Sequence, residues 1–249
     1  MSFATLSGAR IPHVGGGNTD PYFSDVIFLA GMGDFADHSP LNLGTATPTH
    51  ETVDAANPLG GVSSIACDGM SGQSAQWSSS GPLVIPVPCI FEAWFKCAST
   101  GDGNTHPVVN GRNSSNRGPF LFLVGLNSQW SVSNHDGSNL LSAPARAFTP
   151  DVWNYCALLV DNAAQMVAHI GLQGGMTTPT AVATSDSVGL LLGPHWALGG
   201  NTTDLPIFSP YLGNYAGVRV TKNTTRGHTV ASGGVGVSYA VPTPPWPLS

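Results

Sequence analysis

The clearest pattern in the chain is an alternation of side chains between residues 88 and 97. In an extended strand, successive side chains point to opposite faces. One face of this segment carries Cys89, Phe91, Ala93, Phe95 and Cys97, and the other carries Ile90, Glu92, Trp94 and Lys96. Because the first set is entirely apolar, the pattern predicts a strand that turns those five side chains toward a core.

Similar short apolar runs recur along the chain, and turn-forming Asp-Gly, Asn and Gly-Gly positions separate them. They lie at 23–30, 62–67, 107–110, 120–126, 130–134, 153–161, 166–172, 188–192 and 215–221. No segment combines a 3.6-residue apolar period with the length of a helix. Many short strands at this spacing are typical of an all-β sandwich or barrel. Residues 35–58 are rich in Pro, Thr, Asn and Asp, and are predicted to form a long loop.

The same pattern divides the chain into three parts. Residues 1–21 are predicted to be an N-terminal arm, residues 22–222 the β-sandwich, and residues 223–249 an extended, Pro-rich tail. Prolines lack the N–H that a central strand must donate, so the tail should run over the surface. The arm is expected to anchor on a neighbouring subunit through Phe3, Leu6, Ile11 and Val14. The alternative for this arm is an unanchored terminus.

Composition excludes several classes of partner. Charged residues make up only 9% of the chain, with 8 basic against 14 acidic residues, so clustered cations for nucleic acid are absent from the sequence. The first residues lack the basic flank and apolar run of a signal peptide, and export by that route is not expected. No apolar run approaches the roughly 20 residues that a membrane-spanning helix needs.

The four cysteines are predicted to be buried free thiols. They are Cys67, Cys89, Cys97 and Cys156, and no C-x-x-C pair or nearby histidine suggests a zinc site. Free thiols of this kind act as small apolar residues in a reducing compartment. A disulfide between Cys67 or Cys156 and another strand remains an alternative after release into an oxidising medium.

Motifs for catalysis are weak. Glycoside hydrolysis needs two facing carboxylates, yet the chain has two glutamates, Glu51 and Glu92, and Glu92 stands between apolar neighbours. The segment Gly69–Gln73 lacks the second glycine of a G-x-S-x-G turn. The histidines are scattered and form no H-E-x-x-H pattern. We therefore expect a protein that is not an enzyme and that needs no cofactor.

Several segments, in order, resemble concanavalin A-like or laminin-G-like domains of tailed-phage structural proteins. Asp20–Phe23 and Cys67–Gly69 are similar to the family's first strand and to a short Asp-Gly strand end. Ile90–Lys96 resembles its "T-I-E-A-W-V-K" strand, and Trp153–Asp161 resembles "W-x-H-V-A-L-V-R-D". The last part of the family's domain has the pattern "I-G-G … F-N-G-Y-I-D-D-V-R-I-T-K". Leu198–Asn201 together with Leu212–Lys222 resemble this pattern. The resemblance implies a two-sheet antiparallel jelly-roll sandwich.

One departure from the family bears on calcium. Ala216 and Gly217 stand where many relatives carry acidic residues, and calcium needs several oxygen ligands. Asp34, Asp37 and Asp68 could still gather at one rim and hold the ion. The alternative is that each aspartate forms a turn by accepting backbone N–H bonds.

The first functional hypothesis is a non-enzymatic virion structural protein. The resemblance, the low charge and the two extended ends favour a capsid decoration or accessory protein, assembled in the host cytoplasm. Its partners would be other virion proteins, either the major capsid protein or tail subunits. We also expect a homo-oligomer, with dimer and trimer both open.

The alternative is a carbohydrate-binding adhesin on the tail or head surface that contacts a host-surface glycan. Aromatic rings stack on the apolar faces of sugars, and Trp77, Trp130 and Trp196 are candidate stacking residues. The competing interpretation of each tryptophan is packing in the core. The two functions are compatible, because many weakly binding copies reinforce one another.

Overall fold

The computed structural model describes residues 20–246, apart from eleven internal segments. Those segments are 80–82, 98–103, 112–116, 125–128, 137–139, 143–145, 162–165, 182–189, 193–194, 201–210 and 232–234. In several strands, including all strands between residues 117 and 142, the backbone alone is described. The predicted anchors of the arm, Phe3, Leu6, Ile11 and Val14, lie outside the described residues.

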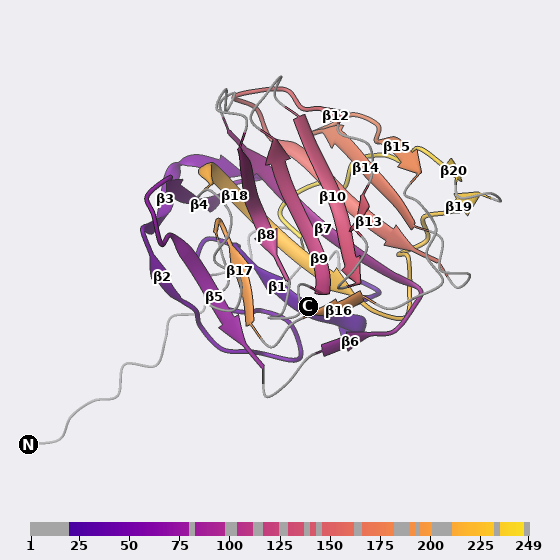
Figure 1. The fold of residues 1–249 in the computed structure, drawn as a ribbon, viewed down its shortest axis with the longest axis horizontal. Helices are drawn as coiled ribbons and strands as arrows, with labels where there is room; N and C mark the ends of the chain where they lie inside the picture. Colours follow the sequence, from indigo (N-terminus) through magenta and orange to yellow (C-terminus); the bar gives the residue numbers. More distant parts are fainter. Residues whose placement is uncertain are drawn as a thin grey trace, which may run out of the picture.

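The described chain forms two antiparallel sheets (Figure 1), which confirms the predicted all-β sandwich. The first sheet has the order β15-β14-β13-β7-β18-β4-β3, and β1 also pairs with β18. Its strands are β1 (Val26–Ala30), β3 (Glu51–Leu59), β4 (Val62–Asp68), β7 (Cys89–Lys96), β13 (Asn154–Val160), β14 (Met166–Leu172), β15 (Thr178–Ala181) and β18 (Leu212–Thr221).

The second sheet has the order β11-β10-β9-β8-β17-β5-β2, with β12 beside β10. Its strands are β2 (Thr47–Thr49), β5 (Ser74–Ser78), β8 (Thr105–Asn110), β9 (Arg117–Val124), β10 (Gln129–Asp136), β11 (Leu140–Ser142), β12 (Arg146–Ala147) and β17 (His195–Leu198). Two small pairs complete the strands: β6 (Leu83–Ile85) with β16 (Leu190–Leu192), and β19 (Val230–Ala231) with β20 (Val235–Gly236). A 3₁₀ turn, η1 (Phe23–Asp25), precedes β1.

The main core lies between the sheets, and β7 contributes the face predicted from its sequence. Cys89, Phe91, Ala93, Phe95 and Cys97 all belong to this core and are at most 3% exposed. Phe28 of β1 is at its centre and makes edge-on ring contacts with Trp77 and Trp196 at centroid distances of 5.2 and 4.6 Å. Such contacts add to the free energy gained from burying the rings.

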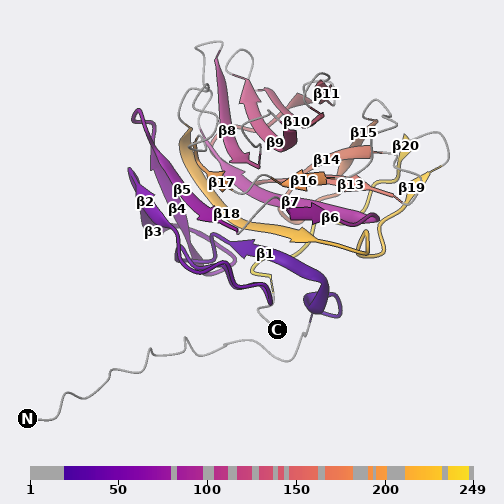
Figure 2. The ribbon, with the colours of Figure 1, turned by 60° about the horizontal axis from the view of Figure 1, so that its bottom comes forward.

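The outer face of the first sheet is also buried, which the alternation in β7 did not predict. Ile90, Glu92 and Trp94 point to this face and are each 0% exposed. The chain after β20, residues 237–246, lies across this face and buries Val241 and Trp246 against it. We call this segment the C-terminal strap. In Figure 2, β1 and β18 of the first sheet lie below β8, β9 and β10 of the second sheet.

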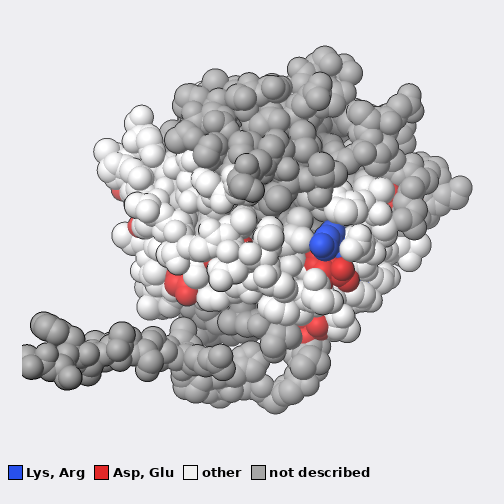
Figure 3. Space-filling view, turned by 90° about the horizontal axis from the view of Figure 1, so that it is seen from below, with Lys and Arg blue, Asp and Glu red and all other residues white. Residues whose placement is uncertain are grey.

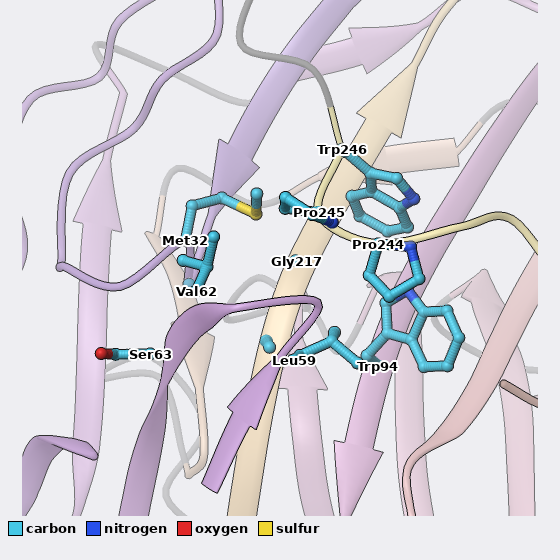
Figure 4. Close-up of a pocket in the computed structure, with 11 residues that line it drawn as sticks. Met32, Leu59, Val62, Ser63, Trp94, Gly217, Pro244, Pro245 and Trp246 are labelled. Carbon is cyan, nitrogen blue, oxygen red and sulfur yellow. The ribbon is translucent and has the colours of Figure 1, made fainter. Parts of the chain in front are cut away.

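The strap packs closely where it ends. Pro244, Pro245 and Trp246 line a cavity together with Met32, Leu59 and Trp94 (Figure 4). The cavity volume is about 10 Å³, which leaves room for at most one water molecule. Residues 237–246 of the predicted Pro-rich tail therefore cover the chain's own sheet.

The predicted loop at 35–58 is partly wrong. Residues 47–49 form β2, and residues 51–59 form β3, which pairs with β4 from Glu51 to Asp54 and again at Leu59. Polar and proline residues are accepted here because β2 and β3 end the main strand orders of their sheets, where one side of a strand needs no partner. The bulge between Asp54 and Leu59 accommodates Pro58.

Replacing Phe28 by alanine should lower the free energy of unfolding by about 3–5 kcal/mol, because it removes a fully buried ring that two tryptophans contact. Urea denaturation followed by fluorescence measures the loss. Phe28→Leu is the matched control and should cost clearly less, since it leaves a smaller cavity. Equal, small losses for both variants would contradict the central position of Phe28.

Candidate functional site

The structure places two of the predicted sugar-stacking tryptophans in the core. Trp77 of β5 and Trp196 of β17 lie opposite each other in register, and both are 2% exposed. Their side chains point between the sheets onto Phe28, so the prediction that they are exposed is wrong. Trp130 lies in β10, whose side chains are outside the described residues.

The aspartates considered for calcium act as turn formers. Asp37 accepts backbone N–H bonds from Leu29, Ser39 and Leu43. Asp34 accepts one from Ala36, and Asp68 accepts one from Met70. Among the described residues, no three His, Cys, Asp or Glu side chains are grouped to hold a metal ion. The structure therefore does not bring these aspartates together at one rim.

Glu92 is the centre of a buried charged cluster beneath the C-terminal strap. Arg219 donates to its Oε2 through Nε at 2.9 Å, and the Arg219 Nη2 lies 2.8 Å from the same oxygen. The Tyr155 hydroxyl donates to Oε1 at 2.8 Å. Arg226 donates to both carboxylate oxygens of Asp20 at 2.7 Å, and Arg219 Nη1 lies 3.4 Å from Asp20. Two carboxylates thus neutralise two guanidinium groups away from solvent.

A row of partly exposed side chains crosses the outer face of the first sheet near one rim. Asn214 of β18 pairs with Lys96 of β7 on one side and with Ala66 of β4 on the other, and Ala66 pairs with Thr52 of β3. Trp153 extends this row, because it precedes Asn154, the partner of Phe95. We call Trp153, Lys96, Asn214, Ala66 and Thr52 the rim row. Strands lie about 4.8 Å apart, so the row spans roughly 20 Å.

The bulged part of β3 orients the row. Asn57 accepts a hydrogen bond from Lys96 Nζ at 2.7 Å, and the Pro58 carbonyl accepts one from Trp153 Nε1 at 3.1 Å. Residues 55–58 therefore reach from β3 to the level of β7 and β13, and fix the ammonium group and the indole ring. Asn57 and Asn214 both donate to Asp54 Oδ2, at 2.7 and 2.9 Å. These bonds lower the pKa of Asp54 and keep it ionised.

The rim row ends in an open hollow between β3 and β4. The hollow has a volume of about 460 Å³ and is lined by His50, Glu51, Thr52, Ala66, Cys67 and Asp68. His50 Nδ1 lies 3.4 Å from Asp68 Oδ2 at its mouth. His50 has a φ of 57°, a left-handed conformation that costs free energy for a residue with a side chain. Such strain is common at binding and catalytic sites.

Glu51 carries a buried carboxyl group, which lies on the opposite face of β3 from Thr52 and points to the core between the sheets. It is 5% exposed, and the Tyr215 hydroxyl donates to its Oε2 at 2.8 Å. Burial raises the pKa of Glu51 to about 8, although the bond from Tyr215 acts in the opposite direction. The group is therefore largely protonated at neutral pH. The neighbouring Cys67 thiol has a raised pKa as well, chiefly because of burial, and is unreactive.

All four cysteines are buried and free, as predicted. Burial raises the pKa of Cys89 and Cys97 to about 12, so these thiols also stay protonated.

The described residues contain no helix long and apolar enough to cross a membrane.

The polar side chains at the rim row and hollow suit a hydroxyl-rich ligand, although Nδ2 of Asn214 already donates to Asp54 and Ser64. They comprise an amide, a hydroxyl, an ammonium group, an imidazole and part of an indole ring, which together donate and accept hydrogen bonds without a dense charge. Figure 3 shows one side of the molecule, where charged side chains are few among the described residues. The sequence predicted a strand from Trp153 onward, but no local pattern reveals the hydrogen bond that its indole donates to Pro58, 95 residues earlier.

No protein-family model matches the chain. No curated protein matches it either. Solved structures do match. The binding domain of botulinum neurotoxin serotype G superposes with a TM-score of 0.55 at 8% identity, over 81% of this chain and 49% of that chain. For the binding domain of Paraclostridial Mosquitocidal Protein 1, the TM-score is 0.53 at 9% identity, over 80% and 49% of the two chains.

A botulinum neurotoxin type C structure matches with a TM-score of 0.52 at 10% identity, over 80% of this chain and 48% of that chain. Its description states that cell entry of that toxin depends on interaction with two ganglioside molecules. This chain therefore spans about half the length of these neighbours. At such low identity the likeness shows the fold alone, an all-β sandwich. None of these matches supports the resemblance to concanavalin A-like or laminin-G-like phage proteins.

Glu51→Gln should flatten the pH dependence of stability. The folded state holds a proton on Glu51 up to about pH 8, whereas the unfolded state loses it near the ordinary value of 4.5, so wild-type stability falls between these pH values. The variant keeps an acceptor for Tyr215 and should be more stable than the wild type at pH 9, by on the order of a few kcal/mol.

Urea denaturation at pH 4, 7 and 9 measures this effect. Asp68→Asn, at an exposed carboxylate of the same hollow, is the control and should keep the wild-type slope with pH. If Glu51→Gln followed the wild type at all three pH values, Glu51 would have an ordinary pKa in the folded protein.

Proposed function

We propose that this protein is a non-enzymatic carbohydrate-binding module that attaches the larger assembly carrying it to a glycan-coated surface. The observation that carries the proposal is the rim row, in which the bulge of β3 holds Trp153 and Lys96 beside Asn214. An oligosaccharide lying across the strands would stack one ring on Trp153 and place hydroxyl groups against Lys96, Asn214 and Thr52. At its far end the ligand would enter the hollow beside His50 and Asp68.

The structural neighbours support this function for the chain. Two are described as binding domains, one of a botulinum neurotoxin and one of a mosquitocidal protein. The description of the type C neurotoxin names gangliosides, which are glycan-bearing lipids, as what that toxin interacts with. A sandwich of this type is therefore compatible with binding to glycans on cell surfaces. The net charge of −6 favours an uncharged glycan over a strongly acidic one.

A binding function without turnover is supported by the engagement of both glutamates. Two arginines and Tyr155 surround Glu92 under the strap, and Glu51 is buried against Tyr215. Neither arrangement leaves a pair of carboxyl groups free to flank a glycosidic bond, as hydrolysis requires.

A virion structural protein is the second candidate function. Three of the segments that resemble tailed-phage proteins lie in β7, β13 and β18, and these strands are adjacent in the order β13-β7-β18. Because these segments form one continuous part of the sheet, their similarity to phage proteins supports this candidate more than three separate similarities would. The chain would then be a capsid decoration or accessory protein, assembled in the host cytoplasm as a homo-oligomer and bound to a major capsid protein or to tail subunits.

Removing Trp153 should abolish most glycan binding. On a glycan array, the wild type should bind a defined set of oligosaccharides, and Trp153→Ala should weaken binding about tenfold or more through loss of ring stacking. Because Trp153 also packs partly on the sheet, Thr52→Arg provides a second variant, which places a bulky side chain at an exposed position of the row.

Thr47→Arg is the matched control, since Thr47 is an equally exposed threonine on β2, outside the rim row. It should bind like the wild type. Absence of glycan binding by the wild type, or equal binding by Thr52→Arg and Thr47→Arg, would overturn the assignment of this site.

Deleting residues 1–19 tests the virion candidate, and it leaves the buried Asp20 in place. Loss of the arm should release the protein from phage particles, while the shortened chain keeps its unfolding temperature. Quantitative mass spectrometry of purified particles measures the copy number. Undiminished incorporation would argue against an arm that anchors on neighbouring subunits.

A further inference from the structure

The C-terminal strap is held at two places along the outer face of the first sheet. Near its start, the backbone of Tyr239 exchanges hydrogen bonds with Thr177, and Val241 N donates to the Gly175 carbonyl at 2.9 Å. Near its end, the Trp246 ring lies over the guanidinium group of Arg219 at 4.0 Å. There the strap also contacts the β3–β4 turn, where a Cβ on Gly60 would lie 2.4 Å from the Pro244 carbonyl carbon.

Tyr239 is the contact between the strap and two histidines. The ring of His228, from the segment after β18, stacks on Tyr239 at 3.6 Å and an interplanar angle of 14°. The ring of His169, which belongs to β14, also lies near Tyr239, and the two ring centroids are 4.7 Å apart. The strap residue is therefore packed against two side chains that gain a positive charge in mild acid.

The surroundings of His169 offer no acceptor for a second ring N–H. This residue is 0% exposed, its Nδ1 lies 3.2 Å from Thr177 Oγ1, and its Nε2 has no hydrogen-bond partner in the described structure. Protonation would bury a charged ring with an unsatisfied N–H, which is strongly unfavourable in an apolar site.

The other ionisable groups around Tyr239 do not offset this charge. Its hydroxyl lies 3.1 Å from the Tyr155 hydroxyl, which in turn donates to Glu92. Glu92 is the carboxylate nearest to the histidines, but Arg219 and Arg226 already face it. The remaining charged group of the cluster, Asp20, pairs with the same two arginines, and the nearby Cys156 thiol is neutral because burial raises its pKa.

We propose that the C-terminal strap is an acid-operated latch. Protonation of His169 and His228 releases residues 237–246 from the outer face of the first sheet. Opening hydrates both imidazolium rings and uncovers the apolar side chains that the strap protects, including Ile90, Trp94 and Leu159. The latch uses histidines outside the rim row and adds a pH-dependent surface to the protein.

The direction of the titration follows from burial. Burial lowers the pKa of His169 to about 4, with a further lowering by His228. Burial also lowers the pKa of His228, and Arg226 and Arg219 act in the same direction, although Glu92 opposes them. With the strap open, both rings regain an ordinary pKa near 6.5. Acid therefore favours the open state between about pH 6.5 and 4, and His169 alone changes the closed-to-open ratio by up to about 300-fold.

Amide hydrogen exchange of the full chain at pH 7 and pH 5 tests the latch, after correction for the intrinsic pH dependence of exchange. Protection of the strap amides should fall at least tenfold at pH 5, while amides of β7 and β13 remain protected. In the double variant His169→Gln, His228→Gln, the strap should stay protected at pH 5. His50→Asn is the matched control, since it removes an exposed histidine outside the cluster, and should behave like the wild type.

Three results would overturn the proposal. They are strap protection in the wild type that is unchanged at pH 5, an equal loss in the double variant, and loss of strap and core protection together, which would report global unfolding. If the double variant does not fold, His228→Gln serves alone, because His228 is only partly buried. It should then retain more strap protection at pH 5 than the wild type, and an unchanged loss would again overturn the latch.

Discussion

The buried ion pair between Glu92 and Arg219 is the interaction on which the outer half of this structure depends. The two residues face each other on neighbouring strands, β7 and β18, and neither is more than 2% exposed. Removing one partner of such a pair leaves an uncompensated charge, which is strongly destabilising. The pair is therefore stabilised by the groups that surround it and keep water away. These are Asp20 before β1, Arg226 after β18, and the strap, whose Trp246 lies over Arg219.

This arrangement gives the first sheet two different cores. Its inner face is an apolar core shared with the second sheet, whereas its outer face combines apolar residues with a neutralised set of charges beneath the strap. The rim row lies beyond the strap, where the same face reaches solvent. Binding groups are thus placed on strands that are buried along most of their length, and such rigid support lowers the entropy lost when a ligand is bound.

Period-two alternation was enough to predict the sandwich and the inward face of β7, because burial between two sheets requires that pattern. It failed for Ile90, Glu92 and Trp94, whose burial depends on a strap about 150 residues later in the sequence. Alternation alone did not decide which faces of β5 and β17 are buried, so Trp77 and Trp196 were candidate stacking residues, whereas their side chains lie in the core. Trp153 was recognised as the start of a strand, while its partner Pro58 lay in a predicted loop.

The convergence of both ends of the described chain on Arg219 has a topological consequence. Asp20 and Trp246 contact the same guanidinium group from opposite ends of the polypeptide. Residues 20 and 246 are thereby joined through a single side chain. A substitution at Arg219 would therefore loosen the described chain at both of its limits at once.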